Sequence, residues 1–149
     1  MTAIKRLLLL LSGAALCAGC HTFSPVPAFN DIALTPRDLH PGDVAVITVK
    51  LTDKNNIVER VEGVLKEAPQ VTFRLRDDGQ APDEKANDDV WTLRVDVPFD
   101  APPGEFVLEF TAYRSDGLAV PIRNDSGDTV PLTANYSFAV QYAQDTQPK

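Results

Sequence analysis

The acid-rich segment 76–89 holds the side chains of this sequence that are best suited to bind a metal cation. Six of its fourteen residues are acidic, and it lies between two stretches with β-strand character. Ca²⁺ takes about six to eight oxygen ligands from carboxylates, amides, carbonyls and water. The segment therefore predicts a candidate calcium site, and its expected ligands are Asp77, Asp78, Asp83, Asn87 and Asp89.

This segment does not follow the EF-hand pattern. Counted from Asp83, the sixth position is Asp88 instead of glycine and the twelfth is Arg94 instead of glutamate. Asp and Asn side chains also form Asx-turns with nearby backbone N–H groups and keep an exposed loop solvated. Two interpretations stay open from the sequence, a calcium site and a solvated loop without a ligand.

Residues for enzymatic catalysis are scarce. Only two histidines occur, His21 and His40, and His40 precedes Pro41-Gly42 in a predicted turn. The Gly-x-Ser-x-Gly, His-Glu-x-x-His, P-loop and dinucleotide-binding motifs are missing, and two separated histidines predict no zinc site. Asp78 and Asp89 are the one carboxylate pair that we nominate for glycoside cleavage. We expect no enzyme and keep this pair as the enzymatic alternative.

Composition and net charge argue against nucleic acid as a partner. The chain has 149 residues, 44% of them hydrophobic, with 14 Lys and Arg against 21 Asp and Glu, and a formal net charge of −7. These values are typical of one folded domain. Nucleic-acid binding relies on a basic face, which this chain cannot assemble, so we expect no nucleic-acid partner.

The first nineteen residues have the three parts of a secretory signal. Lys5 and Arg6 precede an apolar run that starts at Leu7, and small residues follow it up to Gly19. The run is too short to span a bilayer, which takes roughly 20 apolar residues. We therefore predict a cleaved signal peptide over residues 1–19.

The end of this leader, Leu16-Cys17-Ala18-Gly19-Cys20, resembles the lipobox of bacterial lipoproteins. Leucine usually stands three positions before the acceptor cysteine, where this chain has Cys17. The resemblance implies that Cys20 becomes the mature N-terminus and carries diacylglycerol, with fatty acids such as palmitate. It also implies the cell envelope as location, and His21 in place of Asp after the cysteine favours the outer membrane, facing the periplasm or the exterior. An ordinary secretory signal cut elsewhere is the alternative.

A short tether follows the expected anchor. Pro25 and Pro27 disfavour a helix, so residues 20–28 are predicted to form the lipid anchor and an extended connection. Loss of residues 1–19 removes Lys5 and Arg6 and no acid, which leaves 12 basic and 21 acidic residues, a formal −9. Anionic head groups repel such a body, so the lipid alone should hold it to the membrane.

Alternating polar and apolar residues predict strands in the rest of the chain. In Val90–Val97, Trp91, Leu93 and Val95 fall on one side, and Thr92 and Arg94 fall on the other. Further strands are expected over 30–34, 44–51, 57–64, 71–76, 105–113, 118–122 and 136–142, with 124–134 left uncertain. Turn residues separate these stretches at short intervals. We expect Trp91 at the centre of the core.

Seven or eight short strands in about 115 residues are typical of a single antiparallel β-sandwich. Their spacing resembles that of bacterial immunoglobulin-like and fibronectin type III-like domains, and a transthyretin-like or other sandwich is the alternative. We therefore predict an all-β fold with the sandwich over 29–143 and a flexible tail over 144–149. Consecutive antiparallel strands would place loops 53–56, 77–89 and 114–117 at one end, where the tether also enters.

These features together predict a non-enzymatic envelope lipoprotein that acts as an interaction or structural module. Its partners would be the membrane, through the lipid, and an envelope protein or surface component whose identity the sequence does not give. No cofactor is expected apart from the possible calcium ion. In the calcium alternative the acidic end stiffens the domain or bridges it to a polyanionic surface component.

Overall fold

The computed structural model describes residues 26–142, and these residues form nine β-strands. The predicted signal peptide, Cys20 and the tail 144–149 lie outside the described residues. The strands are β1 (Ala28–Thr35), β2 (Val44–Thr52), β3 (Arg60–Leu65), β4 (Ala68–Arg74), β5 (Val90–Asp96), β6 (Gly104–Tyr113), β7 (Pro121–Arg123), β8 (Thr129–Pro131) and β9 (Thr133–Val140). Within 26–142, no helix is long and apolar enough to cross a membrane.

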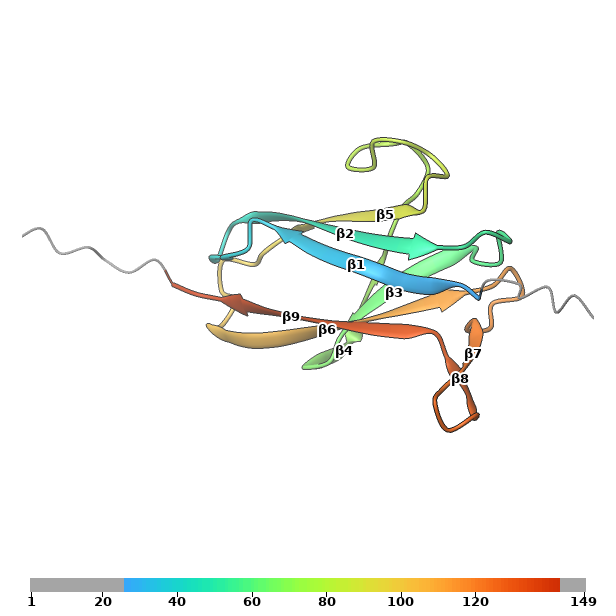
Figure 1. Ribbon diagram of the computed structural model, residues 1–149. Helices are drawn as coiled ribbons and strands as arrows, with labels where there is room; N and C mark the ends of the chain where they lie inside the picture. Colours follow the sequence, from blue (N-terminus) through green and yellow to red (C-terminus); the bar gives the residue numbers. More distant parts are fainter. Residues whose placement is uncertain (1–25, 143–149) are drawn as a thin grey trace, which may run out of the picture.

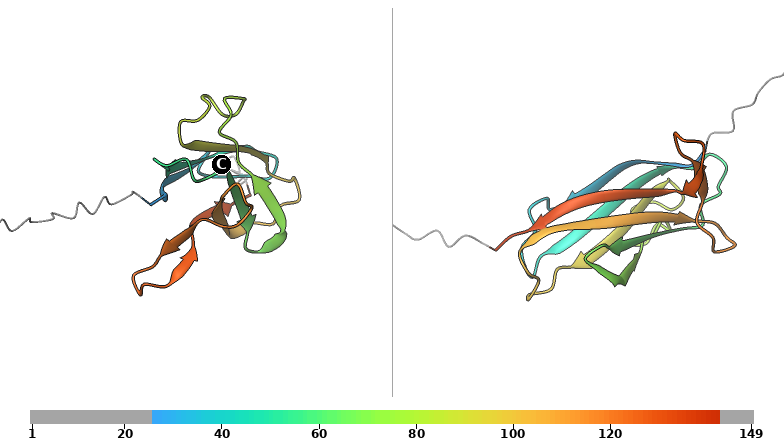
Figure 2. Two further views of the ribbon diagram at one scale, coloured as in Figure 1. Left: turned by 90° about the vertical axis from the view of Figure 1, so that its right-hand side faces the viewer. Right: turned by 90° about the horizontal axis from the view of Figure 1, so that it is seen from below.

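The strands form two large sheets and one small hairpin. One sheet has the order β1-β2-β5, the second has the order β4-β3-β6-β9, and β7 pairs with β8. Every paired neighbour is antiparallel. The two large sheets lie face to face in Figure 1, and Figure 2 shows the β7–β8 hairpin projecting away from them. The prediction of an all-β, antiparallel fold is confirmed.

The core lies between the sheets and follows the alternation of the sequence. On β2 every second residue from Ala45 to Leu51 is buried, because successive side chains of a strand point to opposite faces. Leu108, Phe110 and Ala112 alternate in the same way on β6 of the other sheet. The inward-facing apolar side chains of one sheet therefore pack against those of the other. Their burial is the main contribution to the stability of the domain.

Phe110, and not Trp91, is the largest fully buried side chain of the described residues. It lies against Gly63 on the neighbouring strand, where an added Cβ would be 3.0 Å from Phe110 Cε1. The absence of a side chain at Gly63 therefore leaves room for the Phe110 ring. Trp91 is only partly buried at the edge of the core, so the prediction that it occupies the centre is wrong.

Each predicted strand lies within three residues of an observed one at both ends, and two regions need comment. The strand expected from residue 57 begins at Arg60, because 53–59 forms a loop in which Val58 N–H donates to Asp53 Oδ2 at 2.6 Å. The uncertain segment 124–134 contains a turn and β8, so the described strands number nine instead of seven or eight.

Strand direction gives the domain two distinct ends (Figure 1). The acidic end is where β1 begins, beside the loops 53–59, 75–89 and 114–120. The distal end is where β9 finishes, beside the loops 36–43 and 97–103. The expected grouping of acidic loops at the end where the chain enters the domain is therefore observed.

Candidate functional site

Both sheets hold the start of the 75–89 loop. Leu75 N–H donates to Val61 O at 3.0 Å, and Leu75 is 2% exposed. Arg76 and Thr92 exchange backbone hydrogen bonds of 2.9 and 2.7 Å, and Thr92 lies buried beneath the loop. The acidic side chains that follow are thus presented from a fixed base at the acidic end.

Three carboxylates of the loop converge. Asp77, Asp83 and Asp88 each place an oxygen within 4.8 Å of the others, and Asp83 is only 4% exposed. Backbone N–H groups orient all three, because Gly79 N–H donates to Asp83, Asp88 N–H donates to Asp77, and Val90 N–H donates to Asp88. We call these three residues the carboxylate triad; two of them were among the expected calcium ligands.

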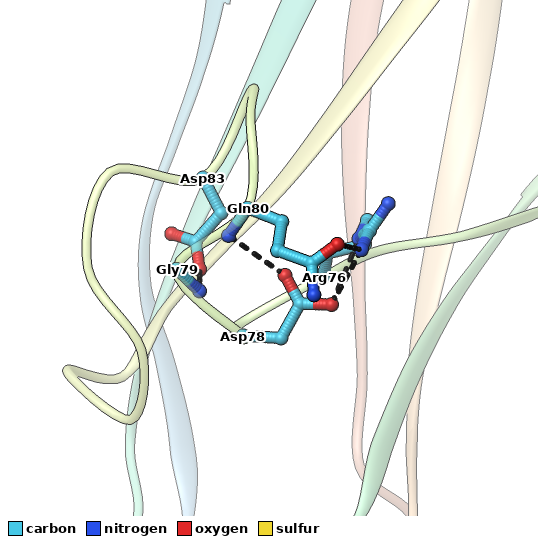
Figure 3. A network of polar contacts seen from close by, with 5 residues as sticks. All are labelled: Arg76, Asp78, Gly79, Gln80 and Asp83. Carbon is cyan, nitrogen blue, oxygen red and sulfur yellow. Dashed lines mark hydrogen bonds and ion pairs between the residues drawn. The ribbon is translucent and has the colours of Figure 1, made fainter.

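The other three expected ligands lie outside the triad. Asp78 turns away, and its Oδ2 accepts hydrogen bonds from Arg76 Nε at 3.0 Å and Nη2 at 2.7 Å (Figure 3). Asn87 and Asp89 have left-handed backbone conformations, with φ of 56° and 66°, and these shape the loop. Asp89 O accepts from Leu51 N–H at 2.9 Å, which ties the loop to β2.

The Asp77 carboxyl of the triad has a raised pKa. Burial raises the pKa of the Asp77 carboxyl above its ordinary value of 3.8, and the nearby Asp83 and Asp88 carboxylates act in the same direction. Hydrogen bonds from the backbone of Asp88 and Asn87 partly oppose this rise. A cation held between the three groups would remove the repulsion that they experience.

An additional buried carboxylate faces the same region. Asp53 lines a cleft of about 910 Å³ together with Asp77, Asp78, Asn87 and Asp89. It is 5% exposed, and although Oδ2 accepts from Val58 N–H, Oδ1 is buried and accepts no hydrogen bond from the described residues. A buried polar atom of this kind usually has a partner, and a cation or water in the cleft would provide one.

The nominated carboxylate pair gains no support from this geometry. A general acid needs a raised pKa, whereas the hydrogen bond from Arg76 lowers the pKa of Asp78 below its ordinary value. His40 lies in the 36–43 turn as expected, with Nδ1 3.3 Å from Asp43 Oδ2. This pair fixes the turn, because Asp43 also accepts from His40 N–H at 2.7 Å.

Sequence reasoning missed Asp88 as a ligand, and it placed the loop of Asp53 at this end without naming Asp53 as part of the site. Asp88 was visible as part of the acid-rich segment, but the left-handed residues on both sides of it decide where its side chain points. Asp53 belongs to a different loop and reaches the cleft only through the pairing of the strands.

No protein-family model matches this chain, and no curated protein sequence matches it. Solved structures give distant likenesses. An endo-beta-1,4-mannanase from Thermotoga petrophila is 12% identical at a TM-score of 0.47, over 85% of this chain and only 22% of the mannanase chain. A Niemann-Pick type C2 protein from the Japanese carpenter ant is 15% identical at a TM-score of 0.45, over 78% of this chain and 94% of that one. Likenesses at these scores carry no information on function.

Proposed function

We propose that this protein is a non-enzymatic lipoprotein of the bacterial envelope, anchored through Cys20, whose sandwich domain docks a partner at its distal end. The observation that carries the proposal is the opposite placement of two features. The chain enters the domain at the acidic end, and an exposed aromatic side chain, Phe99, stands at the other end.

An immunoglobulin-like or fibronectin type III-like topology is the finer part of this proposal. The order β1-β2-β5 and β4-β3-β6-β9 supports it, because the third and sixth strands pair in one sheet and the second and fifth pair in the other. In such domains the fourth strand can join the sheet of the third, as C′ does in immunoglobulin variable domains. Folds of this class serve many functions, so the function has to be argued from the surface.

The distal end carries the exposed apolar side chains that suit docking. Phe99 is 88% exposed, and Tyr142 and Val44 nearby are 57% and 42% exposed. The ring of Phe99 lies over Gly42, which has a positive φ of 88° and where a Cβ would be 2.5 Å from Phe99 Cε1. An aromatic side chain has only two χ angles and so loses little conformational freedom on binding, and aromatic residues are enriched at protein interfaces.

The anchor and the charge direct the distal end away from the membrane. Residues 21–27 would span roughly 22 Å if extended at about 3.1 Å per residue. The mature chain carries a formal −9, so anionic head groups repel the domain. A lipid at the acidic end therefore presents Phe99 toward the surrounding compartment.

Phe99→Ser is expected to abolish partner capture. The lipidated protein, purified from detergent-solubilised envelopes, should bring down a reproducible partner, and Phe99→Ser should reduce its recovery at least about tenfold, as loss of an aromatic anchor does. Leu118→Ser is the matched control, because Leu118 is 61% exposed at the acidic end. Recovery of no reproducible partner, or equal loss in both variants, would count against the proposal.

The second candidate function is calcium binding at the acidic end. The convergence of the carboxylate triad within 4.8 Å favours it. Asp77 and Asp83 would serve as ligands together with Asp88, and Asp78 would not. Because a ligand that binds only the folded state stabilises it, the expected effect is a higher melting temperature.

Asp77→Asn is expected to raise the melting temperature at pH 7 without calcium, by about 1–3 °C. A carboxyl with a raised folded pKa stabilises fully below 3.8, its unfolded value, and this contribution is lost as pH rises through the folded pKa. The amide keeps the acceptor for Asp88 N–H but carries no charge. The advantage of the variant should therefore vanish below pH 3.8, which melts at several pH values will measure.

The same variant should lose the response to calcium. Millimolar calcium should raise the melting temperature of the wild type relative to EDTA, and Asp77→Asn should show little of this rise. Asp78→Asn is the control, because that side chain pairs with Arg76 and should leave the response intact. Coincident wild-type curves in calcium and EDTA would end the calcium candidate.

A further inference from the structure

An apolar cavity of about 340 Å³, open to solvent on one side, lies between the sheets toward the distal end. Residues of both sheets and of the loop after β5 line it. Fifteen of its sixteen lining residues are Ala, Val, Leu, Ile, Phe or Pro, and the exception is Asp100 on that loop. The ring centroids of Phe106 and Phe138 lie 5.7 Å apart, and both residues form part of the wall.

The cavity coincides with a change in how well the core is packed. Toward the acidic end Val61, Phe110 and Ala112 are fully buried at 0% exposure. Toward the distal end the cavity wall combines buried residues such as Leu39 and Ile47 with side chains that are only partly buried, namely Leu65, Phe73, Val95, Phe106 and Phe138. An apolar space therefore remains between the sheets toward the distal end, whereas the cleft at the acidic end is lined mainly by polar and charged residues.

Apolar walls that stay in contact with water cost free energy, and a ligand that covers them recovers it. Water is a poor occupant of this space, since the lining offers it few polar partners. Apolar cavities instead bind apolar ligands, and a volume above about 300 Å³ is within the range of small-molecule sites.

We propose that this cavity binds one single-chain amphiphile with an uncharged head group. At roughly 30 Å³ for each methylene-sized group, it holds a chain of about ten or eleven carbons. The rim provides no cation among its lining residues and does provide the carboxylate of Asp100. An anionic head group would be repelled there, whereas a hydroxyl can donate a hydrogen bond. This inference goes beyond the docking function and does not depend on it.

Binding of 1-decanol and decanoate to the domain tests the proposal, because the two probes share chain length and differ in charge. Isothermal titration should show saturable binding of one 1-decanol molecule, and decanoate should bind at least about tenfold more weakly. Asp100→Asn should restore most of the affinity for decanoate. Equal affinities for the two probes, or no binding of 1-decanol up to its solubility limit, would overturn the proposal.

Variants that fill the cavity test whether 1-decanol binds there. Ala101→Trp fills the rim from a loop, and Val95→Phe fills the space from a strand, so each should lower the affinity for 1-decanol at least about tenfold. Val71→Phe is the control, because Val71 is exposed on β4 and does not line the cavity. Circular dichroism and melting curves will show that each variant is folded. Unchanged affinity in both blocking variants would place the probe elsewhere and refute the assignment.

Discussion

The Cys20→Ser variant is expected to disappear almost completely from the membrane fraction of the cells that produce it. In the proposed function Cys20 accepts two acyl chains, and serine offers no thiol to receive them. One acyl chain gives only marginal membrane binding, whereas two or more hold a protein stably. The rest of the chain would not compensate, since a body with a formal −9 is repelled by anionic lipid.

Fractionation and intact mass spectrometry measure this effect together. The wild type should begin at Cys20 and carry the mass of its acyl groups. Cys17→Ser is the matched control, because residue 17 belongs to the predicted signal peptide and leaves with it, so this variant should stay in the membrane. A wild-type product that retains Met1 and lacks fatty acid would remove both the anchor and the envelope location from the proposed function.

Most of the strands could be predicted because their patterns are long and regular. β5 and β6 each have a clear alternation over seven or more residues, and burial of one face fixes the register of such a strand. β2 is apolar on both sides over most of its length, as expected of a central strand. β3 was predicted three residues too early, since Ile57 and Val58 look like strand residues. In the structure Val58 N–H donates a hydrogen bond to the Asp53 carboxylate and so belongs to a loop, and Ile57 is 36% exposed.

The acidic site could be located from the sequence, but its members could not. Local composition shows that six acids gather in fourteen residues. Which of them converge depends on contacts that composition does not show. Asp78 accepts a hydrogen bond from Arg76 instead of joining the triad. Asn87 and Asp89, on either side of Asp88, have left-handed backbone conformations, which composition does not reveal. Asp53 reaches the same cleft from another loop, in agreement with the expected placement of loops 53–56 and 77–89 at one end, but its burial could not be predicted.

The apolar cavity was also beyond the reach of the sequence. Alternation identifies which side chains point inward, and Phe73, Val95, Phe106 and Phe138 all do so. It does not tell how closely two sheets approach at each end. The same limit explains why the prediction for Trp91 is wrong. Its size and hydrophobicity suggest the centre of the core, whereas its position on the edge strand β5 leaves it only partly buried beside the cleft.

Phe110→Ala is expected to cost about 3–5 kcal/mol of unfolding free energy, the largest loss among the aromatic residues of the domain. Phe110 is fully buried and lies against Gly63, so its removal leaves a void that rigid neighbouring strands cannot close. A domain of this size has a stability of only about 5–15 kcal/mol, so the variant should be close to the limit of folding.

Phe138→Ala is the matched comparison, because Phe138 already lines an open cavity and is only partly buried. Its loss should cost about 1–2 kcal/mol, since fewer contacts are removed and solvent already reaches the site. Urea unfolding with equal m-values gives both numbers. Equal losses would mean that the distal half of the core is as tightly filled as the other half, and the space assigned to a ligand would then be occupied by the protein itself.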